Sequence, residues 1–116
     1  MNPLSAIFGN RVQVSNLSSD EFEKIMQEND NAVLLDVRTP GENKEVRIPN
    51  SKLIDMMDPN FIEKIGSLDK NKTYLVYCRS GNRSFYAVKE MLKLGFENVH
   101  NLEPGIIGWL GEIERG

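Results

Sequence analysis

Residues 73–94 read TYLVYCRSGNRSFYAVKEMLKL, and this stretch indicates both a fold class and a reactive centre. An apolar, β-prone run over residues 73–77 leads directly into Cys78, and a run of helix-forming residues begins at Ser84. A strand, a tight polar loop and a helix in this order are typical of an α/β protein. Because ligands in such proteins bind beyond the carboxyl ends of the strands, we expect a functional site at Cys78.

The loop surrounds the only cysteine of the chain with groups that stabilise negative charge. Its backbone N–H groups and the helix N-terminus present partial positive charge, and Arg79 and Arg83 add two full charges. These surroundings predict a thiol pKa below the ordinary value of about 8.5, and therefore a reactive thiolate. The alternative is a structural cysteine buried at the end of a strand. The two arginines, Gly81, and Ser84 as the expected N-cap of the next helix favour the nucleophile.

The composition is that of an ordinary globular protein, and it excludes several classes of function. The 116 residues, 40% hydrophobic and 27% charged, suffice for a single domain over residues 1–116, with residues 1–10 as a possible loose N-terminal segment. Fourteen basic and seventeen acidic residues give a net charge of −3, which argues against a general nucleic-acid or membrane binder. One cysteine and one histidine do not make a metal site, and we expect no cofactor.

The single cysteine also bears on partners and on location. No internal disulfide can form, so any adduct on Cys78 has to be discharged by an external molecule. The sequence has no signal-peptide pattern at its start and no apolar run approaching the ~20 residues that cross a bilayer. We therefore expect a cytoplasmic protein, and a monomer.

The rest of the sequence alternates predicted strands with predicted helices. Strands are predicted at residues 12–14, 32–37, 52–54, 73–77 and 97–102, and helices at 18–28, 59–65, 84–94 and 104–110. Ser18 and Glu21 form a capping-box pattern at the start of the first helix, and Asp58 is the expected N-cap of the second. Residues 38–50 are polar, with prolines at 40 and 49, and indicate mainly a long loop that could contain a helical turn. This alternation predicts a three-layer α/β/α domain with a central, mostly parallel sheet of about five strands.

Three segments resemble the single-domain rhodaneses of the sulfurtransferase family. They are LDVRTPGE at 35–42, YCRSGNRS at 77–84 and LEPGIIGW at 102–109, and the resemblance extends over about residues 18–109. It implies a rhodanese-like fold and a sulfurtransferase that moves a sulfane sulfur from thiosulfate or a similar donor. It also implies an acceptor such as cyanide, a dithiol or a protein thiol, for example that of a thioredoxin-like protein.

The resemblance assigns roles to the loop residues. Cys78 would carry the sulfur as a persulfide, and the following residues would bind the persulfide and the donor's oxyanion: Arg79, Ser80, Gly81, Asn82, Arg83 and Ser84. The forked arginine side chains suit the oxygens of sulfite. Asp36 and Arg38 match a family segment whose role we take to be structural.

One stretch departs from the family pattern, and three other functions stay open. Arg47 occupies the position of a family histidine, and the glycines on either side are missing.

Cysteine phosphatases and arsenate reductases share the strand, loop and helix but have Cys-x5-Arg, whereas this loop has Cys-x4-Arg. His100 lies in a predicted strand, which disfavours a Cys–His hydrolase. A persulfide carrier or a thiol redox sensor would also need a reactive Cys78.

Overall fold

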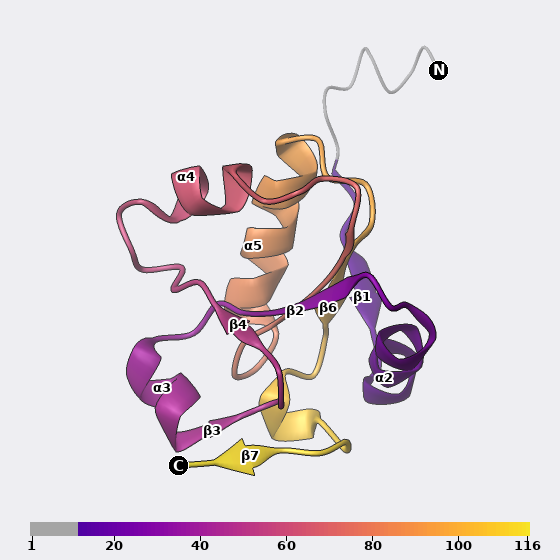
Figure 1. The fold of residues 1–116 in the computed structure, drawn as a ribbon, viewed down its shortest axis with the longest axis vertical. Coiled ribbons are helices and arrows are strands. Elements are labelled where there is room, and N and C mark those ends of the chain that lie inside the picture. The colour runs from indigo at the N-terminus through magenta and orange to yellow at the C-terminus, as the bar shows by residue number, and fades with distance from the viewer. Residues whose placement is uncertain (1–11) are drawn as a thin grey trace.

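A parallel sheet of five strands forms the middle layer of the computed structural model, which describes residues 12–116 (Figure 1). The strands lie in the order β1-β6-β5-β2-β4, and every neighbouring pair is parallel. Their bounds are Ser15–Leu17 (β1), Ala32–Asp36 (β2), Lys52–Leu53 (β4), Thr73–Tyr77 (β5) and Val99–Leu102 (β6). The predicted fold class is confirmed. The expectation for residues 1–10 falls outside the described residues.

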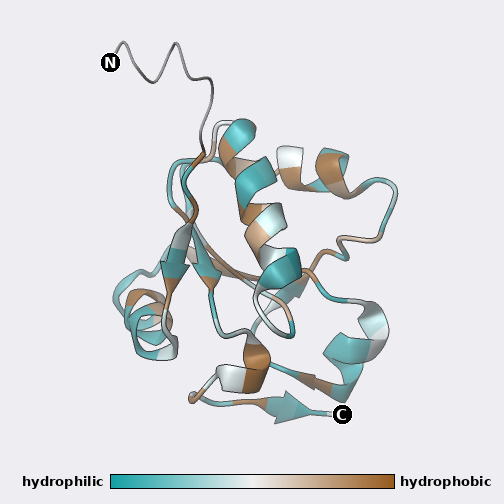
Figure 2. Cartoon of the chain, turned by 180° about the vertical axis from the view of Figure 1, so that it is seen from behind, coloured by the Kyte–Doolittle hydropathy of each residue, from teal (hydrophilic) through white to brown (hydrophobic). Residues whose placement is uncertain are grey.

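Helices cover both faces of this sheet. Helix α2 (Ser19–Glu28) lies on one face, whereas α4 (Phe61–Gly66) and α5 (Asn82–Lys93) lie on the other. In Figure 2, α2 and α5 carry alternating teal and brown bands, as expected for helices that bury only one face. No helix within residues 12–116 is long and apolar enough to span a membrane.

The alternation of side chains along β5 directs Cys78 toward α5. Successive residues of a strand point to opposite faces of the sheet. Leu75 packs in the core cluster that contains Phe22 of α2, whereas Val76 and Cys78 pack in the cluster that contains Met91 of α5. The first turn of α5 is therefore the part of the chain that can supply hydrogen-bond donors to the Cys78 sulfur.

Residues 40–47, within the predicted loop 38–50, form a short helix and a short strand; the strand was not predicted. Helix α3 (Pro40–Glu45) begins after Thr39, and the Thr39 and Glu42 side chains make a complete capping box with proline in the first turn. Strand β3 (Val46–Arg47) follows and pairs antiparallel with β7 (Glu114–Arg115) at the end of the chain. The capping box can be recognised in the sequence because its two residues are three apart. The pairing of β3 cannot, because its partner β7 lies far along the sequence.

Several predicted boundaries are also wrong by a few residues. The first strand is residues 15–17 rather than 12–14, because pairing with β6 sets its position. Helix α4 begins at Phe61 rather than at residue 59, and Asn60 rather than Asp58 is its N-cap residue; the Asp58 carboxylate accepts the N–H of Asn60 in the turn before the helix. Strand β6 begins at Val99, and a 3₁₀ turn η1 (Ile106–Gly108) replaces the last predicted helix.

The predicted N-cap of α5 is wrong in a way that concerns function. Helix α5 begins at Asn82, with Gly81 as its N-cap at φ +93°. Ser84 lies within the first turn and is fully buried. Its hydroxyl group is therefore available to the Cys78 sulfur rather than to the helix end.

Candidate active site

The Cys78 sulfur is held by donors from the loop and from the first turn of α5. The N–H of Gly81 lies 3.2 Å from Sγ, the N–H of Ser84 3.4 Å and the Ser84 hydroxyl 3.3 Å. Cys78 is only 1% exposed. A nearly buried sulfur with three donors is suited to carry negative charge.

These contacts set the ionisation of the thiol. Burial raises the pKa of Cys78, but hydrogen bonds from the Ser84 hydroxyl and from the N–H groups of Ser84, Ser80 and Gly81 outweigh it. The pKa of the Cys78 thiol therefore lies below its ordinary value. The direction agrees with the prediction, and so do the backbone N–H donors. The Ser84 hydroxyl was not predicted as a donor, and the groups that lower the pKa of Cys78 are these N–H groups and this hydroxyl rather than the arginines.

Close backbone contacts fix the shape of the loop. A Cβ atom at Gly81 would lie 2.0 Å from the carbonyl oxygen of Glu103, and one at Gly105 would lie 2.1 Å from that of Arg79. Asn101 of β6 is buried and donates from Nδ2 to the carbonyl oxygen of Gly81 at 3.2 Å. These contacts hold the loop against β6 and against the chain before η1. The loop N–H groups therefore stay directed toward Sγ of Cys78.

The Arg83 side chain forms an ion pair with the Glu42 carboxylate. Its two terminal nitrogens donate to the two oxygens of Glu42 at 2.8 Å each, which joins α5 to α3. Arg83 holds the pKa of the Glu42 carboxyl at about 2, below its usual 4.5. The charge that the sequence assigned to the loop is therefore largely paired at this position.

Asp36 and Arg38 form a buried ion pair at the end of β2. Arg38 donates through Nε at 2.9 Å and through a terminal nitrogen at 2.7 Å to the two oxygens of Asp36. The same guanidinium donates to the carbonyl oxygen of Val46 at 2.6 Å, and the Tyr77 hydroxyl donates to Asp36 at 3.2 Å. This network fixes α3 and β3 beside the loop, which agrees with the structural role expected for Asp36 and Arg38.

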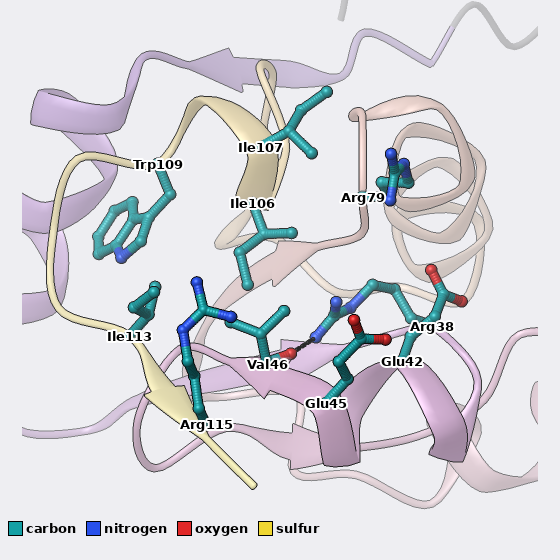
Figure 3. Close-up of a pocket in the computed structure, with 10 residues that line it drawn as sticks. All are labelled: Arg38, Glu42, Glu45, Val46, Arg79, Ile106, Ile107, Trp109, Ile113 and Arg115. Carbon is teal, nitrogen blue, oxygen red and sulfur yellow. Dashed lines mark hydrogen bonds between the residues drawn. The ribbon is translucent and has the colours of Figure 1, made fainter.

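The remaining predicted residues lie at the exposed side of the loop. Ser80 and Asn82 are exposed, and of the two only Ser80, through its N–H, contributes to the ionisation of Cys78. Arg79 is also exposed, and it lines a cavity between η1, α3 and β7 (Figure 3). The six residues predicted to bind substrate thus surround Cys78, but only Gly81 and Ser84 bond directly to its sulfur within the described chain.

Other residues near the site were missed or received a different role. Glu42, the partner of Arg83, is not among the predicted site residues, although its capping-box spacing from Thr39 is a signal in the sequence for its place at the start of α3. Arg47, at the family's histidine position, donates to Glu114 at 2.8 Å and to the carbonyl oxygen of Asn43 at 3.2 Å. His100 lies in β6 and contacts the Ser15 hydroxyl at 2.7 Å, away from Cys78. Within residues 12–116, no group of three potential ligands could hold a metal ion.

Comparison with known proteins gives a consistent family. The family model described as a rhodanese-like domain matches residues 18–112. A protein of Bacillus subtilis (strain 168) named "Putative sulfurtransferase YtwF" is 35% identical over 103 residues, which cover 89% of this chain and 97% of that protein. A protein of Allochromatium vinosum named "Sulfurtransferase" is 30% identical over 97 residues, covering 83% of this chain and 88% of its own length.

A solved structure agrees with the sequence relatives. The rhodanese-like domain protein of Staphylococcus aureus has a TM-score of 0.72 at 31% identity, and the match covers 89% of this chain and 99% of that one. The fold, the family model and the relatives point to the same group of proteins. This chain belongs to the rhodanese-like family, and its chemistry is sulfur transfer.

Proposed function

We propose that the protein transfers a sulfane sulfur from thiosulfate or a similar small donor to a thiophilic acceptor through a persulfide on Cys78. The observation that carries this proposal is the set of donors around a single, nearly buried sulfur atom: two N–H groups and one hydroxyl within 3.4 Å of Sγ. Such donors stabilise both a thiolate and the persulfide that replaces it.

In the first step, the Cys78 thiolate attacks the outer sulfur of thiosulfate. A bond forms between the two sulfurs, the S–S bond of thiosulfate breaks, and sulfite leaves with the electron pair. No proton has to move, so the step needs no general base when Cys78 is ionised. Arg79 is exposed beside the loop, and we assign it to the oxygens of the leaving sulfite.

In the second step, an external nucleophile attacks the outer sulfur of the persulfide. The bond between that sulfur and Sγ breaks, and the electron pair returns to Sγ as a thiolate, which the N–H of Gly81 and the Ser84 hydroxyl stabilise. Cyanide would leave as thiocyanate, and a thiol would leave as a persulfide. The chain has no second cysteine that could take this role.

Three observations disfavour phosphoryl transfer in the same loop. Arg83, the residue in the position of a phosphate-binding arginine, is held by both oxygens of Glu42. In addition, Cys78 is only 1% exposed, and the terminal sulfur of thiosulfate can reach such a residue more readily than a phosphorus atom enclosed by oxygens. The loop, with Cys-x4-Arg, is also one residue shorter than a phosphatase loop.

The test is intact mass after incubation with thiosulfate, followed by cyanide. We expect a gain of one sulfur on the wild-type protein, its removal by cyanide with release of thiocyanate, and no gain on Cys78→Ser. Removal matters because a sulfinic acid has nearly the same mass but resists cyanide. A persulfide that forms only with a protein donor would indicate a carrier. A sulfenic acid or mixed disulfide without a persulfide would indicate a redox sensor and contradict the proposal.

A further inference from the structure

Asn101 lies beside the Cys78 loop, although it falls outside the predicted site residues and outside the three segments that resemble the family. It belongs to β6, which pairs with β5 on one side and with β1 on the other. Its register partner on β5 is Val76, whose side chain packs in the core cluster of α5. Register partners point to the same face of a sheet, so the Asn101 amide and the Cys78 sulfur lie on the same face.

The bonds of the Asn101 amide fix its orientation. Its Nδ2 atom donates to the carbonyl oxygen of Gly81 at 3.2 Å and to Oδ1 of Asn16 at 2.9 Å. A backbone carbonyl can only accept, so the amino group of the amide has to face Gly81. Asn101 is 1% exposed, and its Oδ1 is the one buried side-chain nitrogen or oxygen of residues 12–116 that has no hydrogen-bond partner. A buried polar atom without a partner costs stability, which an apolar side chain would avoid.

The bond to Gly81 is therefore the property of Asn101 that we examine for a role in function. The N–H of Gly81 donates to Sγ of Cys78 at 3.2 Å, and its carbonyl oxygen also accepts the N–H of Phe85 at 3.1 Å. Gly81 has φ +93°, and the torsions of glycine are the least restricted of all residues. A bond that holds the Gly81 carbonyl limits rotation at this residue. It therefore also limits the direction of the N–H on the other side of the Gly81 Cα.

We propose that Asn101 is a positioning residue for sulfur transfer, which keeps the Gly81 N–H directed at the Cys78 sulfur by holding the Gly81 carbonyl oxygen. The inference rests on the proposed function, because the thiolate that attacks in the first step and the thiolate that returns in the second both accept from this N–H. Asn101 is not among the groups bonded to Sγ, so it acts only through Gly81.

The experiment replaces the amide by an apolar group of similar shape, in Asn101→Leu. We expect the pH midpoint of Cys78 alkylation by iodoacetamide to rise by about 0.5–1 unit, because one of the donors to the sulfur is weakened rather than removed. Urea unfolding checks that the variant is folded at each pH used. If leucine prevents folding, Asn101→Ala removes the same bond and carries the same expectation.

Asn16→Ala is the matched control. Asn16 is exposed on β1, and its replacement removes the other acceptor of Nδ2 while the bond to Gly81 stays. We expect the midpoint of the wild type. A shift as large as that of Asn101→Leu would assign the effect to the contact between β1 and β6 and overturn the proposal.

The substitutions leave every charge around the loop in place, so a shifted midpoint does not come from a lost charge. The charged side chains concerned are those of the loop and of the elements packed against it: Arg79, Arg83 of α5, Glu42 of α3, Glu103 after β6, and the Asp36–Arg38 pair of β2. A midpoint in Asn101→Leu equal to that of the wild type would overturn the positioning role.

A second measurement separates this inference from the proposed function. Alkylation needs no sulfur donor, so a wild type that gains no sulfur from thiosulfate contradicts the proposed function and leaves the alkylation result standing. When the wild type does form the persulfide, we expect slower uptake by Asn101→Leu at neutral pH and recovery at a pH above its midpoint. Uptake at the wild-type rate at every pH would overturn the proposal. A rate that stays low at every pH would show a general loss of loop shape, and would overturn it as well.

Discussion

Replacing Ser84 by alanine tests the central claim about how the protein makes a reactive thiolate. The Ser84 hydroxyl lies 3.3 Å from Sγ of Cys78, and this is its only side-chain hydrogen bond within the described chain. Alanine keeps the backbone N–H, which also points to Sγ at 3.4 Å, and it favours the helix. The substitution therefore removes one donor to the sulfur and leaves no other polar atom without a partner.

The expected size of the effect follows from the geometry. A hydrogen bond to a charged group contributes about 1.5–3 kcal/mol, and the long distance here favours the lower end. One pKa unit corresponds to about 1.4 kcal/mol, so Ser84→Ala should raise the pKa of Cys78 by about one unit. The sign is upward because the hydroxyl stabilises the thiolate and not the neutral thiol. At neutral pH, the fraction of thiolate and the rate of sulfur uptake should fall.

The assay is the rate of alkylation by iodoacetamide as a function of pH, followed by intact mass. Since the chain has one cysteine, every adduct on sulfur reports on Cys78. Ser67→Ala is the control: its hydroxyl donates to the carbonyl oxygen of Lys64 in α4 at 2.8 Å and is not among the groups bonded to Sγ. A midpoint in Ser84→Ala equal to that of the wild type would refute the assignment of Ser84 as a donor to the thiolate.

Three further predictions concern the frame of the site. Arg83→Ala should raise the pH midpoint of Cys78 alkylation, because it removes a cation and leaves the Glu42 carboxylate unpaired. Glu42→Gln should lower that midpoint, because it removes the anion and leaves Arg83 unpaired. Midpoints equal to that of the wild type in both variants would show that this ion pair does not affect the ionisation of Cys78. Arg38→Ala should lower the free energy of unfolding in urea by about 3–5 kcal/mol, because it leaves the fully buried Asp36 without its cation; a loss below about 1 kcal/mol would contradict that reasoning. Gly81→Ala should abolish persulfide formation measured by mass, because its φ of +93° and a Cβ contact of 2.0 Å with backbone force the loop to move; uptake at the wild-type rate would show that loop shape is not required.

The local pattern of the sequence was sufficient for the architecture and for the position of Cys78. The apolar run over residues 73–77 and the helical run after it specify a strand and a helix, whose periods of 2 and 3.6 are properties of the backbone alone. The same period places Cys78 just beyond β5 and directs its side chain to the α5 face. The boundaries were less certain, because pairing with distant strands, as between β1 and β6, sets where an element begins.

The contacts that give the site its properties were decided only by the tertiary structure. Arg83 and Glu42 are 41 residues apart, and Arg47 and Glu114 are 67 apart, so no local pattern indicates that they meet. Two arginines in one loop look equivalent in sequence, yet packing pairs Arg83 with a carboxylate and leaves Arg79 at a cavity. The sequence determined where the Cys78 sulfur lies, because strand and helix periods are local. The tertiary structure decided which charges surround it, because those partners come from distant segments that meet only when the core packs.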